Sequence, residues 1–505
     1  MSEPARRPPP APASPDLGED VPSGTRRSQW IGRALGPLVF VAIAFLPSEL
    51  HRIEGFGDRP AYAAAVAAWM AVWWFSEAIS IARTACLPLL LFPLLGVFGE
   101  GLAGDTQRTV APFLDAYIFL FLGGMTIGAA MEEWGLHRRV ALQIMRAIGA
   151  EPARLLLGVL IATAFVSMWI SNTATAVMMV PIAMALVAQL ESVSGGRRLA
   201  RFGCAIMLAV AYAANLGGMG TKIGTGTNSI FAGFVADKLD YDLGFLQYIA
   251  IGLPFVLLFM PLLWWALWRH GRTDAPTAAS GRAVLDRELA ALGSMSAPER
   301  RVGVVFLGAA LLWVASDLLR PQLSEIIAAQ GSSFVLQGKH YEAAVAMLAA
   351  GVLLATRSLP LAALRRIPWG ALVLLGGSFA MASGIEGSGL SAWIALQLAI
   401  LADLSLPVQL LLASFSTILI SAFASNTASI NLMLNVLPRS LPVLSVTALA
   451  ASCDFALPAG TPPNAIVFSS GYIRLPTMMR IGVQLDLAAG LLLTLYGWAY
   501  IQFLF

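Results

Sequence analysis

The segment Ser167-Met-Trp-Ile-Ser-Asn-Thr173 has a counterpart 254 residues later (421 − 167 = 254), Ser421-Ala-Phe-Ala-Ser-Asn-Thr427. Each copy interrupts a long apolar stretch with serine, asparagine and threonine. Polar side chains at membrane depth are costly unless they line a site, a cavity or another helix. The two copies therefore predict a duplicated membrane fold built around a polar centre.

Packing between helices is the simplest alternative, because serine, threonine and asparagine also hydrogen-bond across membrane helices. Further matches between the halves argue against it. Leu122-Gly-Gly124 precedes the first copy as Leu375-Gly-Gly377 precedes the second, and Gly224-Thr-Gly-Thr-Asn228 follows the first as Gly460-Thr-Pro-Pro-Asn464 follows the second. Three linked elements in the same order indicate an internal repeat.

Composition places the chain in a bilayer. Its 505 residues are 58% hydrophobic and only 12% charged, whereas soluble proteins have about 25% charged residues. The net charge of +3 is small and the arginines lie in short loops, so we expect no nucleic-acid partner. Three cysteines and four histidines, none in a metal-binding or hydrolase motif, predict neither a metal cluster nor an enzyme.

The first half is expected to contain a hairpin and a broken helix. Residues 1–28 read as a disordered cytoplasmic tail, and residues 29–268 as the first repeat. Within it, the polar-centred stretch 152–190 predicts a hairpin that enters and leaves on one side of the membrane. The glycine-rich interruption of 203–236 predicts a broken helix.

The second half repeats this plan after a polar cytoplasmic linker, 269–301. Residues 302–505 form the second repeat, with a hairpin at 392–438 and a broken helix at 443–474. Arginine-rich loops place the N-terminus in the cytoplasm and the C-terminus outside. We therefore predict an all-α polytopic membrane protein of about eleven transmembrane helices plus two re-entrant hairpins, in two inverted repeats.

The chemistry of such a centre suits an anion and a hard cation together. Helix ends at hairpin tips and breaks present unpaired N–H groups and positive dipole ends, which bind carboxylates. Broken helices also free carbonyl oxygens that can bind sodium. A channel is less favoured, because hairpins that meet near the midplane predict an occluded site. A receptor would need a large soluble domain, and an intramembrane enzyme would need a nucleophile–base pair. The sequence shows neither.

The chain resembles the divalent anion/sodium symporter family of carboxylate and sulfate transporters. The resemblance covers most of residues 33–505 and depends on the paired Ser-Asn-Thr motifs and Thr461-Pro-Pro-Asn464. It implies a homodimer in a bacterial inner membrane, surrounded by lipid. Each protomer would have a scaffold domain and a transport domain that moves like an elevator.

The resemblance also implies roles for individual residues. One sodium site would use Ser167, Ser171, Asn172 and the Gly224 carbonyl, and the other Ser421, Ser425, Asn426 and the Gly460 carbonyl. Substrate carboxylates would lie between the tips, near Asn172, Thr173, Thr225, Asn426, Thr427, Thr461 and Pro462. Sodium would be the coupling ion, with no other cofactor.

Two charged residues depart from the family pattern, Lys222 in the first break and Asp454 in the second. An unpaired charge at this depth needs a partner. Lys222 could form a structural contact with Asp454 or with a carbonyl, attract the dianion, or replace a sodium ion.

The predicted function is sodium-coupled import of a di- or tricarboxylate, with C4-dicarboxylates such as succinate favoured. Two symmetric tips suit two carboxylates. The alternatives are a sodium-independent or proton-coupled exchanger in which Lys222 replaces a sodium ion, and sulfate transport. A sodium/proton antiporter or arsenite permease, which Asp454 would suit, is a more distant possibility.

Overall fold

The computed structural model describes residues 26–276, 281–330, 336–397, 401, 403–458 and 460–504. These residues form helices and connecting turns, with no strand among them. Most of the predicted tail lies outside the described residues. Its last three positions belong to the first helix, which begins at Arg26.

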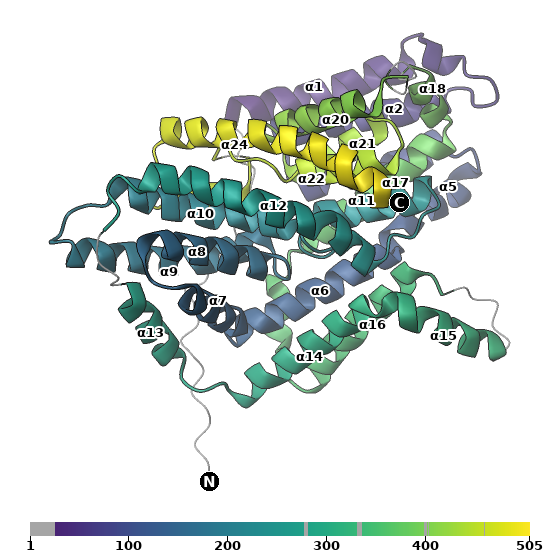
Figure 1. The fold of residues 1–505 in the computed structure, drawn as a ribbon. Helices are drawn as coiled ribbons and strands as arrows, with labels where there is room; N and C mark the ends of the chain where they lie inside the picture. The colour runs from purple at the N-terminus through teal and green to yellow at the C-terminus, as the bar shows by residue number, and fades with distance from the viewer. Residues whose placement is uncertain are drawn as a thin grey trace.

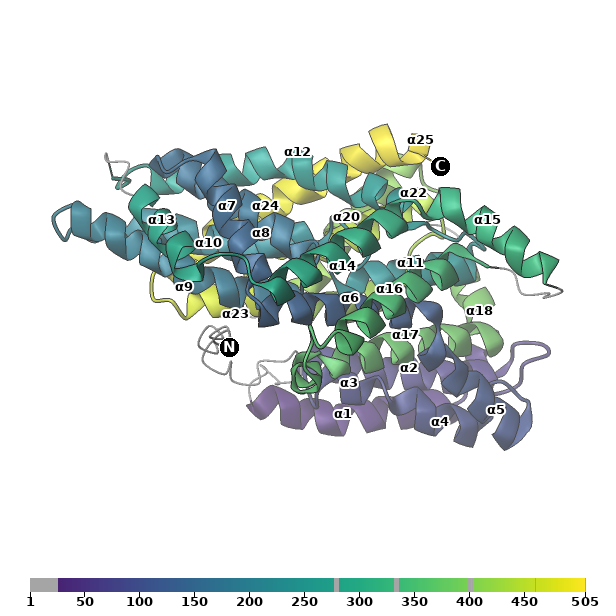
Figure 2. The same ribbon diagram turned by 90° about the horizontal axis from the view of Figure 1, so that it is seen from below.

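Helices α1 to α5 form a group along one edge of the molecule, at the bottom of Figure 2. α1 (Arg26–Phe45) packs along α2 (Arg59–Ser76), and α4 (Leu87–Leu95) contacts both α2 and α5 (Gly101–Val110). The short α3 (Ile81–Thr84) connects α2 to α4. Many side chains on the outer face of α1 are apolar and exposed, as expected for a helix that faces lipid.

Two long helices, α6 (Ala116–Glu133) and α16 (Gly338–Ala355), pack closely against each other in the middle of the fold. A β carbon on Gly123 would lie 2.5 Å from the β carbon of Ala346, so only glycine allows this approach. Small residues at such crossings are typical of membrane helices.

Several helices around this pair come from the second half. α14 (Ala297–Val314) packs on both α6 and α16, and α15 (Ser316–Ala329) continues it after a bend of 80°. α17 (Trp369–Gly387) contacts α6 on one side and the α2–α5 group on the other. α18 (Leu390–Gln397) follows it.

The first half also contains a hairpin and a helix that is interrupted once. α8 (Pro152–Ser167) and α9 (Asn172–Val193) meet at the Ser-Asn-Thr tip, and α10 (Ala200–Gly218) and α11 (Gly226–Lys238) are separated by the glycine-rich segment. α10, which is buried on nearly all sides, packs against α8, α9 and α12 (Phe245–Gly271). Figure 1 shows α8, α9 and α10 together on one side of the molecule.

The second half has the same order of elements. α20 (Leu406–Ser421) and α21 (Asn426–Val436) meet at the second tip, and α22 (Leu441–Ala450) and α23 (Pro462–Phe468) flank the second break. The first arm begins at Leu406, later than the predicted boundary of 392–438. Residues 392–397 instead belong to the separate helix α18. Pro407 at the second helical position suits a helix start, which moves the boundary to this point.

Four further helices of more than ten residues accompany these elements. The long α12 (Phe245–Gly271) and α24 (Leu475–Tyr496) run side by side across the middle of Figure 1. α7 (Leu136–Ile148) is amphipathic, and α13 (Gly281–Leu292), which lies within the predicted linker, packs on it.

Seven helices in the described part of the chain are long and apolar enough to cross a membrane, or eight if the bent pair α14–α15 is one span. Four other apolar helices are shorter, including both first arms of the hairpins. Hairpin arms and half-helices need not span a bilayer alone, because their polar ends meet other protein. The all-helical polytopic architecture is confirmed, and the figure of about eleven spans stays a prediction.

Candidate functional site

The two hairpin tips are built by the same capping interaction. The Ser171 hydroxyl accepts a hydrogen bond from the Ala174 N–H at 3.3 Å, and the Ser425 hydroxyl accepts one from the Ala428 N–H at 3.2 Å. Serine is a favoured N-cap because it satisfies an N–H group that has no partner in the helix. The helix that follows each cap therefore begins at the asparagine, with its positive end at the tip.

A cluster of three oxygen atoms lies behind each tip. Ser167 Oγ lies 2.7 Å from both Asn172 Oδ1 and the Ala214 carbonyl oxygen. The second cluster has the same composition, with Ser421 Oγ 3.0 Å from Asn426 Oδ1 and 2.6 Å from the Ala451 carbonyl oxygen.

Each cluster has more hydrogen-bond acceptors than hydrogen atoms to donate. A serine hydroxyl has one hydrogen, so it can donate to only one of its two neighbours at a time. The excess oxygen atoms are the kind of ligands that a hard cation prefers. Both serines are buried, whereas Asn172 and Asn426 are partly exposed. Of the predicted sodium ligands, Ser167 and Asn172 lie in the first cluster and Ser421 and Asn426 in the second, whereas Ser171 and Ser425 cap the helices.

An asparagine that the prediction did not assign to the site holds each break in place. Asn228 Nδ2 donates to the carbonyl oxygens of Gly218 at 2.7 Å and Thr221 at 2.6 Å. The first bond satisfies the Gly218 carbonyl, which the end of α10 leaves without a helical partner, and the second joins Asn228 to the segment between the two helices.

Asn464 does the same in the second half. Its Nδ2 donates to the carbonyl oxygens of Asp454 and Leu457, both at 3.0 Å. The two carbonyls lie ten and seven residues before the asparagine, as they do before Asn228. The signal was present in the sequence, because both asparagines close the matching motifs of the two breaks.

The two breaks contact each other. Asn215 Nδ2 on α10 donates to Thr461 Oγ1 in the second break at 3.0 Å, and the hydroxyls of Thr227 and Ser452 lie 3.4 Å apart. α10 also packs against α23, and α11 packs against α21 and α22. The structure thus brings the two predicted half-sites into one region.

The predicted substrate residues differ in accessibility. Thr173, Thr225 and Thr427 are partly exposed, as are the two tip asparagines, and Pro462 is exposed. Thr461 is only 4% exposed, and its hydroxyl accepts the bond from Asn215 and a second one from the Asn464 N–H at 3.3 Å. Thr461 therefore has a structural role in addition to the predicted one.

Lys222 does not contact Asp454, so the suggested pair between them is wrong. Its ammonium forms an ion pair with Glu342 on α16 at 2.7 Å and donates to the Leu243 carbonyl. The suggested lysine-to-carbonyl contact is confirmed. Glu342 is held in turn by the Phe245 N–H, which donates to Oε1 at 2.6 Å.

This ion pair is fully buried, and both side chains are 0% exposed. The Lys222 ammonium also lies 5.0 Å from the centre of the Tyr117 ring, a cation–π contact. Because Glu342 neutralises the lysine, the geometry favours neither a lysine that replaces sodium nor one that attracts the dianion.

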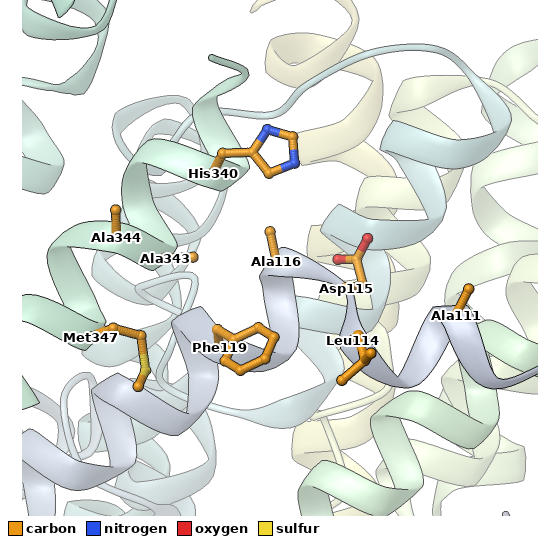
Figure 3. Close-up of a pocket in the computed structure, with 9 residues that line it drawn as sticks. All are labelled: Ala111, Leu114, Asp115, Ala116, Phe119, His340, Ala343, Ala344 and Met347. Atoms are coloured by element: carbon orange, nitrogen blue, oxygen red, sulfur yellow. The ribbon is translucent and has the colours of Figure 1, made fainter. Parts of the chain in front are cut away.

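One cavity among the described residues lies elsewhere in the fold. It has a volume of about 460 Å³ and lies between the start of α6 and the start of α16. Figure 3 shows Asp115 and His340 at its polar side. Asp115 also forms an ion pair with Lys339 at 3.2 Å. No residue of either Ser-Asn-Thr motif lines this cavity, so it is separate from the candidate site.

Comparison with known proteins gives a match along nearly the whole chain. Residues 27–505 match the family described as the sodium:sulfate symporter transmembrane region. The chain is 33% identical over 486 residues to the sodium-dependent dicarboxylate transporter SdcS of Staphylococcus saprophyticus, which covers 91% of this chain and 89% of SdcS. The SdcS protein of Staphylococcus aureus strain USA300 is 32% identical over 494 residues, or 92% of this chain and 90% of that protein.

Two solved transporter structures share the fold at low sequence identity. The YdaH transporter of Alcanivorax borkumensis superimposes with a TM-score of 0.56 at 16% identity, over 84% of this chain and 98% of YdaH. MtrF of Neisseria gonorrhoeae gives a TM-score of 0.51 at 14% identity, over 79% of this chain and 84% of MtrF. These likenesses concern the fold alone.

Proposed function

Because the chain belongs to the sodium:sulfate symporter family, which contains the divalent anion/sodium symporters, we propose that it carries a dicarboxylate across the membrane together with sodium. A C4-dicarboxylate such as succinate is the favoured substrate. Transport is inward and driven by the sodium gradient.

The duplicated oxygen cluster is the observation that carries this proposal. Each half places a serine hydroxyl, an asparagine side-chain oxygen and a main-chain carbonyl within hydrogen-bonding distance, next to the first residue of a helix. The oxygen atoms suit sodium, and the helix N-terminus suits a carboxylate. Asn172 and Asn426 each belong to an oxygen cluster and also begin a helix. Each can therefore contact both the sodium ion and the carboxylate, and so couple their binding.

The substrate is recognised without a full protein charge in this proposal. Glu342 neutralises Lys222, which leaves main-chain N–H groups, amides and hydroxyls of the two tips to bind the dianion. Thr173 and Thr427, each next to a tip asparagine, are partly exposed and can donate from their hydroxyls. Two tips in one region suit a substrate whose two carboxylates are joined by a short carbon chain.

The hairpins and broken helices move as one transport domain in this proposal. They pack together through α10 with α23 and α11 with α21, whereas the pair α6–α16 and the α1–α5 group supply the scaffold. The repeats cover 29–268 and 302–505, and the protein is a homodimer in a bacterial inner membrane with the N-terminus in the cytoplasm.

Uptake into liposomes tests the proposal. The purified protein is reconstituted, and uptake of radiolabelled succinate is followed with external sodium or with choline at equal ionic strength. We expect accumulation with sodium only, and competition by excess malate or fumarate but not by sulfate. Equal uptake in choline would rule out sodium coupling. Uptake that needs internal dicarboxylate instead would identify an exchanger, and competition by sulfate alone would identify a sulfate transporter.

A further inference from the structure

The second break contains a carboxylate without a hydrogen-bond partner. Asp454 is 0% exposed, and neither of its carboxylate oxygens accepts a hydrogen bond from the residues that the structure describes. Burying an ionised carboxylate without compensation costs several kcal/mol or more. The described residues place no partner next to this side chain, so a proton or a bound cation must neutralise it.

The repeat shows which position Asp454 occupies. Asn228 donates to the carbonyl oxygen ten residues before it, at Gly218, and Asn464 donates to the one ten residues before it, at Asp454. Asp454 therefore takes the place of Gly218. In the first break, a β carbon at Gly218 would lie 2.5 Å from Asn172 Oδ1. The first break thus excludes a side chain here, and the second break provides a carboxylate.

The carboxylate lies against a residue of the predicted cation site. A β carbon on Gly460 would overlap the Asp454 side chain, so the carboxylate lies directly beside the glycine whose carbonyl is predicted to bind the second sodium ion. The lysine of the first break cannot supply the missing charge, because Lys222 is paired with Glu342. The next carboxylate, Asp486, carries the same sign, and it accepts a hydrogen bond from the Phe455 N–H at 3.0 Å.

We propose that Asp454 is an anionic oxygen ligand of a monovalent cation, sodium in the first instance, bound at the second break. The inference rests on the proposed function in taking sodium as the cation. Carboxylate, carbonyl and side-chain oxygens form the set that hard cations prefer. The second cation site then carries a negative charge of its own, whereas the oxygen cluster of the first half is neutral.

A site with its own carboxylate binds sodium in the absence of the substrate anion, because Asp454 already balances the charge of the ion. Asp454→Asn keeps the shape and removes the charge. It therefore weakens sodium binding, but it does not destabilise the sodium-free protein, because the amide needs neither a proton nor a cation to be neutral.

Thermal unfolding of the purified full-length protein in detergent tests this. The Tm is followed against NaCl, with choline chloride holding the ionic strength constant and no dicarboxylate present. We expect the sodium concentration for half-maximal stabilisation to rise at least about tenfold in Asp454→Asn. In choline alone, the Tm of Asp454→Asn should equal or exceed that of the wild type.

Asp486→Asn is the matched control, because it removes a nearby buried carboxylate whose oxygen has a hydrogen-bond partner. The sodium concentration for half-maximal stabilisation, or sodium midpoint, of this variant should stay within about threefold of the wild-type value. A charge that acts only at a distance has an effect of this size. Asp454→Gly, which installs the residue of the first break, repeats the test if the asparagine variant does not fold.

The outcomes separate this inference from the proposed function. An unchanged sodium midpoint in the Asp454 variants, or a wild type that sodium does not stabilise beyond choline, would overturn the role of Asp454 even if dicarboxylate uptake needs sodium. If the sodium midpoint shifts as expected but no dicarboxylate is transported, the cation site stands and the proposed function fails.

Discussion

The first and second breaks have the same skeleton but different charges. In both, an asparagine side chain bonds two carbonyl oxygens, and a serine hydroxyl joins the hairpin to the helix before the break. The first break adds Lys222, which Glu342 of α16 neutralises. The second adds Asp454, which has no partner among the described residues.

This difference teaches that the repeat preserves geometry more strictly than electrostatics. The skeleton positions helix ends and oxygen atoms, and both halves need it. Each added charge acts in one half only. The first stabilises the contact between the break and α16, and the second is available for a cation.

Removal of either tip asparagine should have the largest effect. Asn172→Ala and Asn426→Ala each remove an oxygen from one cluster and an amide from the substrate side, and succinate uptake should fall about 100-fold in liposomes. If the second site carries its own charge, high sodium should restore more uptake to Asn426→Ala than to Asn172→Ala.

Asn435→Ala is the control, because Asn435 lies on α21 beyond the tip and bonds only the Asn431 carbonyl among the described residues. Its uptake should stay close to that of the wild type. Uptake within a few-fold of wild type in either tip variant would contradict the assignment of that half-site.

Breaking the ion pair of the first break should have the next largest effect. Lys222→Met leaves Glu342 buried and unpaired, which is expected to cost about 3 to 5 kcal/mol of stability. The measurement is thermal unfolding in detergent. The double variant Lys222→Met with Glu342→Gln should recover most of the lost Tm. If single and double variants unfold at the same temperature, the two side chains are not coupled.

A side chain at Gly218 tests the steric difference between the breaks. The β carbon of Gly218→Ala would lie 2.5 Å from Asn172 Oδ1, so the amide must move, and the sodium concentration for half-maximal uptake should rise about tenfold. Gly308→Ala on α14, where a β carbon meets nothing within 4 Å, is the control and should leave the value unchanged. A wild-type sodium response in Gly218→Ala would mean that Asn172 is not a ligand.

The contact between the breaks should have the smallest effect. Thr227→Val removes a hydroxyl that lies 3.4 Å from that of Ser452. The loss of stability, measured by thermal unfolding, should be less than about 1 kcal/mol. Thr106→Val on α5, whose exposed hydroxyl bonds the Leu102 carbonyl, is the reference for an ordinary threonine. A much larger loss for Thr227→Val would show that this crossing holds the two halves together.

Local patterns made the fold class and the break positions predictable. Apolar stretches of spanning length, interrupted by Ser-Asn-Thr or by clustered glycine, point to membrane helices that end inside the protein. The same patterns located the tips at Asn172 and Asn426, where the helices begin. The start of the second hairpin was placed too early, because the apolar residues of α18 run on toward α20 without a charged boundary until Asp403.

Partners far apart in the chain were not predictable. Lys222 and Glu342 are 120 residues apart, and Asp115 and Lys339 are 224 apart. Spacing rules apply within one helix, and they say nothing about which helices pack together. A pair between Lys222 and Asp454 was suggested because a charge at membrane depth needs a partner, but the sequence does not show which charged side chains touch.

The sequence by itself determined that this protein is a duplicated membrane transporter with two polar tips and two broken helices, because hydropathy and polar interruptions are local properties of the chain. Only the tertiary structure decided which charges are neutralised. The packing of α16 beside the first break pairs Lys222 with Glu342, and no described side chain pairs with Asp454. The electrostatic difference between two similar motifs therefore depends on the helices that surround them.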